Sequence, residues 1–540
     1  MRADSIQLTF LGHAGMRVDG AELRMVMDCW LTERGAFQGS WHQFPSNGHL
    51  DQRQILDVDY ATLSHEHLDH MDADVLTRLP EHAKVLVPRY PSPNLRNRLA
   101  QIGVRNVVEL EAWKKFHLNE HGDWVCFIPE QSPMCHDSAV LLYAGGASFL
   151  HCNDARLTVG QARRAAIECG GRIDLMAIQM SGASWHPICY EYSEPEMLRI
   201  SAAKREGKFK MVSRLVKLAS PEVAMPFAGP MCFLDPELQS FNRWLVDPNG
   251  IFPNQEQAAA YLTTRAPSVA IANWMPGDTY DVLSRTHRSD PHWRDFSYAQ
   301  IPQYIDSYAQ ARSRSIAETE SRHPQPGPEL ADAFAEHFHR LGEMSPYFRE
   351  RIDMTVRFDV RGAVEGRWDV DIRPEGVRVD LGGSSREVQY RFQVDSRWLA
   401  PVIFGDIAWE DLFLSLRIKA WRDPDIYNDY LIGLMKHAEP EALDAIQRHE
   451  HGRDNGERLV VEAAEGTYEI GRYCPHAGED LAIGGVVRPG DVMLCLGHNL
   501  EFDLRTGTCL NARCDPLPTR RVLSHSAPAE NREEAHLVGF

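Results

Sequence analysis

Two short segments near the carboxyl end of the chain constrain its fold more than any other feature. The first reads RYCPHAGEDL and supplies Cys474 and His476, and the second reads CLGHNLEFDLRTG and supplies Cys495 and His498. Eighteen residues separate His476 from Cys495. Thiolates and imidazoles that converge from two loops are typical of a metal centre. We therefore expect this part of the chain to fold around one.

This ligand set fits two kinds of centre. Two thiolates and two imidazoles hold the irons of a Rieske 2Fe-2S cluster, and the same four side chains would close a tetrahedral zinc site. Gly478, Gly497 and the FDLRTG hairpin resemble the backbone turns that wrap the cluster in Rieske domains. We therefore expect a Rieske 2Fe-2S cluster on Cys474, His476, Cys495 and His498, with structural zinc as the alternative.

A second group of metal-binding side chains lies near the amino end. The segment SHEHLDH follows an apolar strand directly and supplies four candidate ligands within six residues, namely His65, His67, Asp69 and His70. So many ligand-type side chains on one loop are costly unless a cation neutralises them. The loop therefore predicts a metal site.

The pattern continues along the chain in GHA at 12–14, Asp28 after a strand, His136 in HDSAVLL and Asp154 in HCNDA. Together with SHEHLDH, these segments resemble successive motifs of the metallo-β-lactamase fold. The resemblance implies a site with two metals, whose ligands are His65, His67 and His136 for one, Asp69 and His70 for the other, and Asp154 for both.

This sequence lacks one motif of the hydrolytic members of the metallo-β-lactamase fold. They supply a further histidine after a late strand, but VAMPFAGPMCF at 223–233 contains none. His186 in SGASWHP is the candidate for that place, and a packed loop residue is the alternative. Glu66, inside the ligand loop, either relays protons or is a solvent-facing neighbour. We take Glu66 and Asp69 as the catalytic candidates.

Strand and helix patterns divide the chain into several parts. We expect an α/β plus β multidomain protein, with a metallo-β-lactamase-like αββα sandwich, a middle α+β module and a C-terminal all-β Rieske domain. The expected boundaries are 1–235 for the metal-binding catalytic domain, 236–348 for a helical extension, 349–445 for a sterol-carrier-like module, 456–525 for the Rieske domain and 526–540 for a tail.

Charge and composition exclude several classes of partner. Lys and Arg number 57 against 76 Asp and Glu, a net charge of -19, which disfavours binding to nucleic acid or to an anionic membrane. The start of the chain is not signal-like, apolar runs are too short to cross a bilayer, and the cysteines are scattered, so we expect a cytoplasmic protein.

One basic run stands out in this acidic chain. Its members are Lys204, Arg205, Lys208, Lys210, Arg214 and Lys217. The run either binds anionic groups of a substrate or forms an ordinary solvated helix face. We take Lys204, Arg205 and Arg214 as the substrate-binding candidates.

The two metal sites are best explained together. A metal-dependent hydrolase needs no electrons, whereas an oxygen-activating iron must be reduced, and a Rieske cluster supplies single electrons. The pairing resembles the CMP-N-acetylneuraminic acid hydroxylase family, as do MPFAGP near 225 and LFLSLRIKAWRDPDIYNDYL at 412–431. In that family the Rieske domain is N-terminal, whereas here it is C-terminal.

The resemblance implies a non-haem iron oxygenase, a hydroxylase or N-oxygenase, with one or two irons. It implies O2 as co-substrate, a small polar substrate that is nucleotide-linked or amino-bearing, and a ferredoxin, cytochrome b5-like protein or reductase as electron donor. Whether the protein forms a homo-oligomer is left open. The alternatives are a zinc hydrolase with a redox-sensing Rieske domain and a pure electron carrier, which leaves the SHEHLDH loop unexplained.

Overall fold

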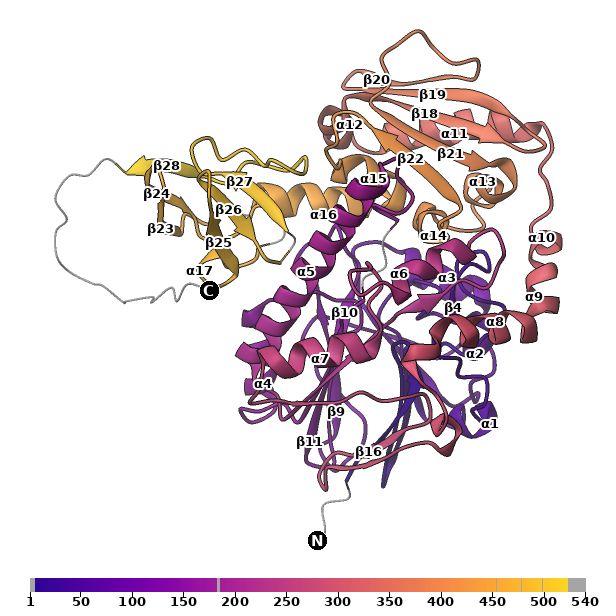
Figure 1. Cartoon of the computed structure of the whole chain (residues 1–540), viewed down its shortest axis with the longest axis vertical. Helices are drawn as coiled ribbons and strands as arrows, with labels where there is room; N and C mark the ends of the chain where they lie inside the picture. Colours follow the sequence, from indigo (N-terminus) through magenta and orange to yellow (C-terminus); the bar gives the residue numbers. More distant parts are fainter. Residues whose placement is uncertain (1–4, 182–184, 453, 477, 498, 523–540) are drawn as a thin grey trace.

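The structure, a computed structural model, describes residues 5–181, 185–452, 454–476, 478–497 and 499–522. Figure 1 shows three parts: a large N-terminal part in indigo and magenta, an orange module above it, and a yellow C-terminal domain at one side. His498 and the expected tail at 526–540 lie outside the described residues.

Two β-sheets form the centre of the N-terminal part. One has the strand order β17-β16-β1-β2-β3-β5-β6-β7, with strands at Thr286–Arg288, Thr279–Asp281, Gln7–Gly12, Gly15–Gly20, Leu23–Met27, Tyr60–Thr62, Lys84–Pro88 and Val107–Leu110. The other has the order β15-β13-β12-β11-β10-β9-β8, with strands at Ala270–Ile271, Val223–Phe227, Leu175–Gln179, Ala147–His151, Ser138–Ala144, Trp124–Pro129 and Phe116–His117. Apolar side chains of both sheets, such as Phe10 and Phe127, share one buried cluster.

Helices cover the outer face of each sheet. Helices α1 (Gln52–Ile55), α2 (Ala73–Leu76) and α3 (Asn94–Ile102) supply apolar side chains to a cluster with β3, β5 and β6. Helices α4 (Val159–Glu168), α5 (Glu194–Ala219) and α7 (Gln255–Arg265) do the same against β9 to β13. The expected αββα sandwich is confirmed.

The sandwich extends beyond the expected boundary at residue 235. Strand β16 pairs with β1, with Leu8 opposite Tyr280, and β15 continues the second sheet beside β13. Leu262 of α7 is fully buried in the same cluster as Phe209 of α5. Residues up to Arg288 are therefore part of the sandwich, and the helical connection begins only after them, with α8 (Ile301–Ala311), α9 (Ser313–Ala317) and α10 (Thr319–Arg322).

The middle module is a five-stranded sheet with helices packed on it. The order is β20-β19-β18-β21-β22, with strands at Gly376–Asp380, Gly366–Arg373, Met354–Arg361, Tyr390–Asp395 and Ile418–Arg422. Its helices are α11 (Glu329–Met344), α12 (Pro346–Ile352), α13 (Ser396–Ile403), α14 (Trp409–Leu414), α15 (Asp429–His437) and α16 (Pro440–His451). Its core is continuous with the sandwich, because Trp30, Phe37 and Tyr190 belong to the same cluster.

The C-terminal domain consists of two three-stranded sheets. They contain β23 (Arg458–Ala463), β24 (Gly466–Gly471) and β28 (Thr519–Val522), and β25 (Gly485–Arg488), β26 (Val492–Cys495) and β27 (Leu500–Asp503), with the short α17 (Leu481–Gly484) between. The domain approaches α5 closely: a Cβ added to Gly207 would lie 2.5 Å from the Asn499 side chain. In Figure 1, α16 leads from the other two parts to this domain.

Within the described part of the chain, the helices are all too short or too polar to cross a bilayer.

We predict that Leu262→Ala lowers the stability of the sandwich by about 2–5 kcal/mol, the usual cost of removing a fully buried leucine. Thr263→Ala, an exposed neighbour on the same helix, should change stability by about 0.5 kcal/mol or less. Thermal unfolding followed by circular dichroism measures both. Equal effects would contradict the assignment of α7 to the sandwich core.

Candidate metal centres

The strand directions bring the N-terminal candidate ligands to one edge of the sandwich. Strands β1, β3 and β5 run in the same direction, because β2 is antiparallel to both β1 and β3 and β5 is parallel to β3. His13, Asp28 and the SHEHLDH loop follow the carboxyl ends of these strands. Asp154 follows β11, and His136 precedes β10, which is antiparallel to β11. All of them therefore meet at one edge, where parallel α/β sheets bind their ligands.

The backbone at this edge is held in an unusual conformation. His13, Asp28 and Asn153 have φ angles of 49°, 40° and 50°, in the left-handed region that side chains other than glycine rarely adopt. Such a residue costs about 1–3 kcal/mol and persists where the surroundings enforce it, as at functional sites. Three of them beside the candidate ligands support a functional role for this edge.

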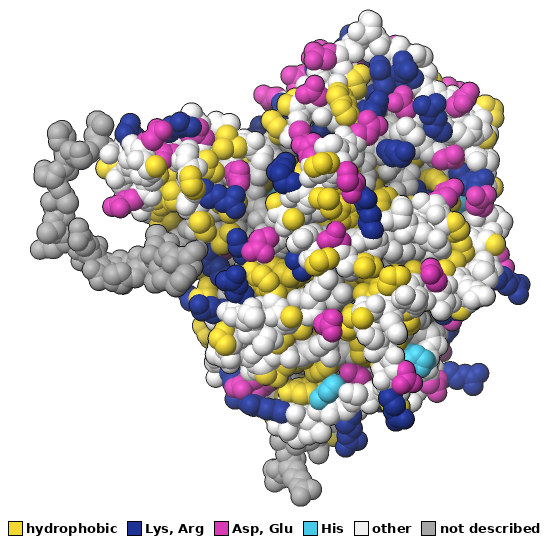
Figure 2. Space-filling view, viewed as in Figure 1, with side chains coloured by type: hydrophobic (Ala, Val, Ile, Leu, Met, Phe, Trp, Pro, Cys, Tyr) yellow, Lys and Arg dark blue, Asp and Glu magenta, His cyan; other side chains and the backbone are white. Residues whose placement is uncertain are grey.

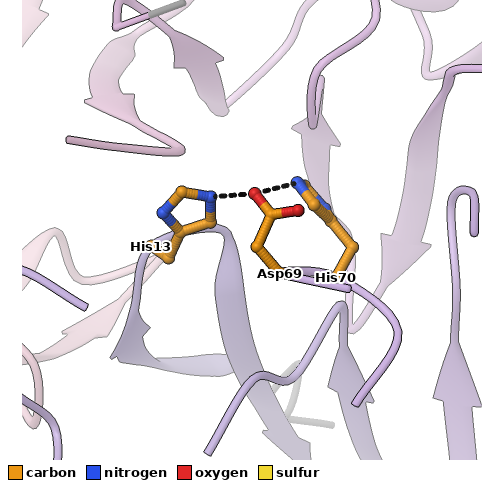
Figure 3. A group of neighbouring side chains, drawn as sticks. All are labelled: His13, Asp69 and His70. Atoms are coloured by element: carbon orange, nitrogen blue, oxygen red, sulfur yellow. Dashed lines mark hydrogen bonds and ion pairs between the residues drawn. The ribbon is translucent and has the colours of Figure 1, made fainter. Parts of the chain in front are cut away.

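Figure 3 shows the tightest part of the cluster, in which the Asp69 carboxylate lies between two histidine rings. Asp69 Oδ2 is 2.8 Å from His13 Nε2 and 3.7 Å from His70 Nε2. His70 Nε2 is also 3.5 Å from Asp154 Oδ1, and its Nδ1 is 3.2 Å from Asp28 Oδ2. His70 is therefore the point where side chains from both sheets converge. His13, which the sequence motifs did not mark as a ligand, belongs to this group.

A second group surrounds His65. Its Nε2 is 2.8 Å from His67 Nδ1 and 3.8 Å from Asp137 Oδ1, while its Nδ1 is 2.7 Å from Ser64 Oγ. Because Ser64 fixes one nitrogen, the other is directed at the cluster. His65 also meets His70 and Asp154, so the two groups are continuous.

Several buried polar atoms of the cluster fit a metal ion. Among the described residues of the ligand groups, Asp69 Oδ1 has no hydrogen-bond partner, and His70 Nε2 and Asp154 Oδ1 make only ion-pair contacts of 3.5 Å or longer. A buried polar atom without a partner costs about 1–3 kcal/mol. A cation bound by imidazole and carboxylate would satisfy these atoms, and the donor set suits iron as well as zinc.

The protonation states of His65 and Asp69 suit a metal. Burial, together with the neighbouring His70 and His67, holds the pKa of His65 well below its usual range, so that its imidazole is neutral. Burial would raise the pKa of Asp69, but His70 and His13 outweigh it and lower that pKa. A neutral imidazole and an ionised carboxylate are the forms that bind metals.

Residues of the middle module complete this site. Glu410 Oε2 of α14 is 3.0 Å from His67 Nε2, and Lys436 Nζ of α15 donates to Glu410 Oε1 at 2.9 Å. Burial opposes a charge on His67, but Glu410 outweighs it and raises the pKa of His67 to about 9. The ring of His437 lies 4.5 Å from that of His136. Sequence motifs did not mark these residues, because their role depends on tertiary contact.

A cavity of about 260 Å³ opens beside the ligand loop, between the sandwich and the middle module. Its wall combines charged side chains from both parts, including Glu66, His67, Arg98, Arg340, Glu410 and Lys436. Arg98 donates to Asp411 Oδ2 at 2.5 Å and to the Glu66 carbonyl at 3.2 Å. This places Glu66 at the wall of a polar cavity.

The structure does not bring every expected site residue to this place. His186 contacts Tyr192 at 3.1 Å and Arg422 at 3.2 Å through Nε2, and Lys204 donates to its carbonyl at 2.9 Å. His186 is in none of the ligand groups among the described residues.

The basic run lies on α5 and does not line the cavity. Arg205 stacks on Phe209 at 4.5 Å, and Arg214 is within electrostatic reach of Glu479 and Asp480 in the C-terminal domain. Figure 2 shows Lys and Arg side chains gathered beside the junction of that domain with the sandwich. This placement fits packing between domains better than substrate binding.

The C-terminal loops bring their cysteines into one small core. Cys474 follows β24 and Cys495 ends β26, and both are fully buried. Gly478 donates its N–H to the Cys474 carbonyl at 2.9 Å and has a φ of 73°, which closes a turn that favours glycine. His476 lies on the same loop, with Nε2 3.8 Å from Asp429 Oδ2.

Comparison with known protein families agrees with the placement of the two metal centres in separate N-terminal and C-terminal domains. Residues 7–182 match the beta-lactamase superfamily domain, and residues 436–521 match the Rieske 2Fe-2S domain. The chain thus has a metallo-β-lactamase-fold domain and a C-terminal Rieske domain, as expected, and the zinc alternative for the C-terminal site is not supported.

Several relatives match this chain over most of its length. Proteins described as Rieske 2Fe-2S iron-sulfur proteins are 28% identical in Mycolicibacterium smegmatis and 27% identical in Mycobacterium tuberculosis, each over 96% of this chain and 100% of the relative. The cytidine monophosphate-N-acetylneuraminic acid hydroxylase of Danio rerio is 22% identical over 79% of this chain and 71% of its own.

We predict that His70→Ala removes metal from the N-terminal site. Loss of a residue that orients a ligand costs about 10–100-fold in metal affinity, so loss of His70 should cost at least as much. His186→Ala should keep the metal, because His186 is outside the ligand groups. Metal analysis of the purified variants tests both, and metal loss in His186→Ala would contradict this assignment.

We also predict that Cys495→Ala abolishes the visible absorption and the EPR signal of a reduced 2Fe-2S cluster and leaves the N-terminal metal in place. Cys509→Ala removes a cysteine that packs against the same small core, and it should keep the cluster. Cluster loss in both variants would show that the effect comes from the fold and not from a lost ligand.

Proposed function

We propose that the chain is a Rieske-coupled oxygenase that hydroxylates a small polar molecule at a non-haem iron in the N-terminal site. The observation that carries this proposal is the combination of a buried His and Asp cluster with a Rieske domain in one chain. A hydrolase would use the first and leave the second without a purpose. The relative from Danio rerio, named as a hydroxylase, supports the same class of reaction.

The residues of the cluster would hold one or two metal ions. His65, His67, His70 and Asp69 are the ligands we favour, with Asp154 between the groups and His13 or Asp137 as further donors. When bound, the metal would activate oxygen, and the Rieske cluster, on the four C-terminal ligands, would supply electrons one at a time. Electrons would reach the Rieske domain from a partner protein.

The chain itself would supply orientation and a hydrogen-bond acceptor for the substrate. Glu410 and Lys436 fix the ring of His67 from the side opposite to His65. Burial would raise the pKa of Glu66, but His136 outweighs it and lowers that pKa to about 2, so that Glu66 is ionised at neutral pH. From the cavity wall, its carboxylate can accept a hydrogen bond from a bound substrate, whereas so low a pKa makes it a weak base. A cavity of about 260 Å³ limits the substrate to a small molecule.

Metal analysis together with oxygen consumption tests the proposal. We predict iron beyond the two atoms of the cluster, and oxygen uptake that requires a reductant. Uptake should fall by at least about 10-fold in both Cys495→Ala, which lacks the cluster, and His67→Ala, which lacks a metal ligand. Zinc in the N-terminal site, with hydrolytic activity that ignores the redox state of the cluster, would overturn the oxygenase in favour of a hydrolase.

A further inference from the structure

Helix α15 has one end beside the loop of His476 and the other end beside the N-terminal site. At its amino end, Asp429 Oδ2 lies 3.8 Å from Nε2 of the cluster ligand His476. Asn428 caps the helix, because its side chain accepts from the Leu431 N–H at 2.9 Å. The helix is thus capped by Asn428, and the Asp429 carboxylate faces His476.

The carboxyl end of α15 reaches the N-terminal site. Lys436 holds Glu410, which contacts His67, and His437 packs on His136. His437 also contacts the Met134 carbonyl through Nε2 at 3.1 Å. The last two residues of the helix are thus tied to the side chains that surround the metal ligands.

The helix is short and immobilised by its surroundings. Lys436 lies seven positions after Asp429, which at 1.5 Å per residue is about 10 Å along the axis. Tyr430, Leu431 and Leu434 are at most 2% exposed. A fully packed helix opens only at a high free energy, so it keeps its two ends at a fixed separation.

The C-terminal domain is docked at the start of this helix. The Arg513 N–H donates to the Tyr427 carbonyl at 2.9 Å, and its guanidinium donates to the Ile352 carbonyl at 2.7 Å. Arg351 pairs with Asp515 at 2.9 Å. These bonds hold the loop of His476 against Asp429 within the same chain.

We propose that α15 connects the two metal centres within one chain, with Asp429 positioning His476 at one end and Lys436 and His437 positioning His67 and His136 at the other. With both centres filled, an electron from the reduced cluster would reach the metal of the same chain without a second subunit. The inference rests on the proposed function in needing both centres to be occupied, but it does not depend on hydroxylation.

Magnetic interaction between the centres tests this arrangement without a substrate. Protein with Co²⁺ in the N-terminal site is compared with protein that has Zn²⁺ there, and the cluster is reduced with dithionite. Paramagnetic Co²⁺ should speed the relaxation of the cluster signal and raise the microwave power at half-saturation, whereas diamagnetic Zn²⁺ should not. Equal saturation in the two forms would place the centres far apart and overturn the proposal.

A mixture of two variants separates connection within a chain from connection between chains. Cys495→Ala loaded with Co²⁺ lacks the cluster, and His67→Ala lacks the N-terminal metal. They are mixed under conditions that exchange subunits. The cluster signal should saturate as in the Zn²⁺ form, and Co²⁺-like relaxation in the mixture would show that the centres pair between chains. If the native metal of the N-terminal site proved to be zinc, the oxygenase proposal would fail, but the magnetic result would be unaffected. The two proposals can therefore fail independently.

Asp429→Asn tests the positioning role. Removing a negative charge near the cluster makes an added electron more favourable, so the midpoint potential should rise. Asp444→Asn, an exposed acid on α16, is the matched control and should leave the potential unchanged. An unchanged potential in Asp429→Asn, with the cluster intact, would contradict the role of this residue.

Discussion

Pairing of buried charges at one edge of the sandwich is the interaction on which the rest of the structure depends. His70 is fully buried among three carboxylates, those of Asp28, Asp69 and Asp154. Removing ionised groups from water costs several kcal/mol each unless partners compensate them. The side chains at this edge compensate one another only in part, and one ligand atom from each of His13, Asp69 and His70 lies within 4.8 Å of the others. A bound cation therefore explains both the composition of the edge and its strained backbone.

The middle module belongs to this site and is more than a spacer. Its Glu410 reaches His67, and its core includes Trp30 and Phe37 of the sandwich. Because the two parts share one apolar cluster, they cannot separate without exposing large aromatic side chains to water. The cavity at their junction therefore has a wall of fixed shape, which a site that must hold a substrate over a metal requires.

The sequence was sufficient where ligands are close together in the chain or occur in specific motifs. The αββα fold and the C-terminal Rieske domain were predicted correctly from these motifs, whereas the metal-binding roles of SHEHLDH and of the two Cys and His segments stay predictions. Glu410 and Lys436 could not be found in this way, since they lie more than 300 residues from His67 and resemble ordinary helix residues. The sequence did not reveal that strands after residue 235 continue the first sheet, because β16 and β17 have three residues each, too few to show an alternating pattern. The substrate-binding role of Lys204, Arg205 and Arg214 stays a prediction, one that their place on α5 does not favour.

The order of domains along the chain gives a physical reason why the two metal centres would pair within one molecule. Helix α16 follows α15 after only Ala438 and Glu439, and β23 begins at Arg458, soon after α16 ends at His451. A short connection gives the Rieske domain a high effective concentration at its own docking surface, which a second molecule must exceed to compete. A Rieske domain at the other end of the chain would have to reach the same surface without this connection. The C-terminal position thus places the cluster where α15 begins, and the covalent path through α16 keeps it there.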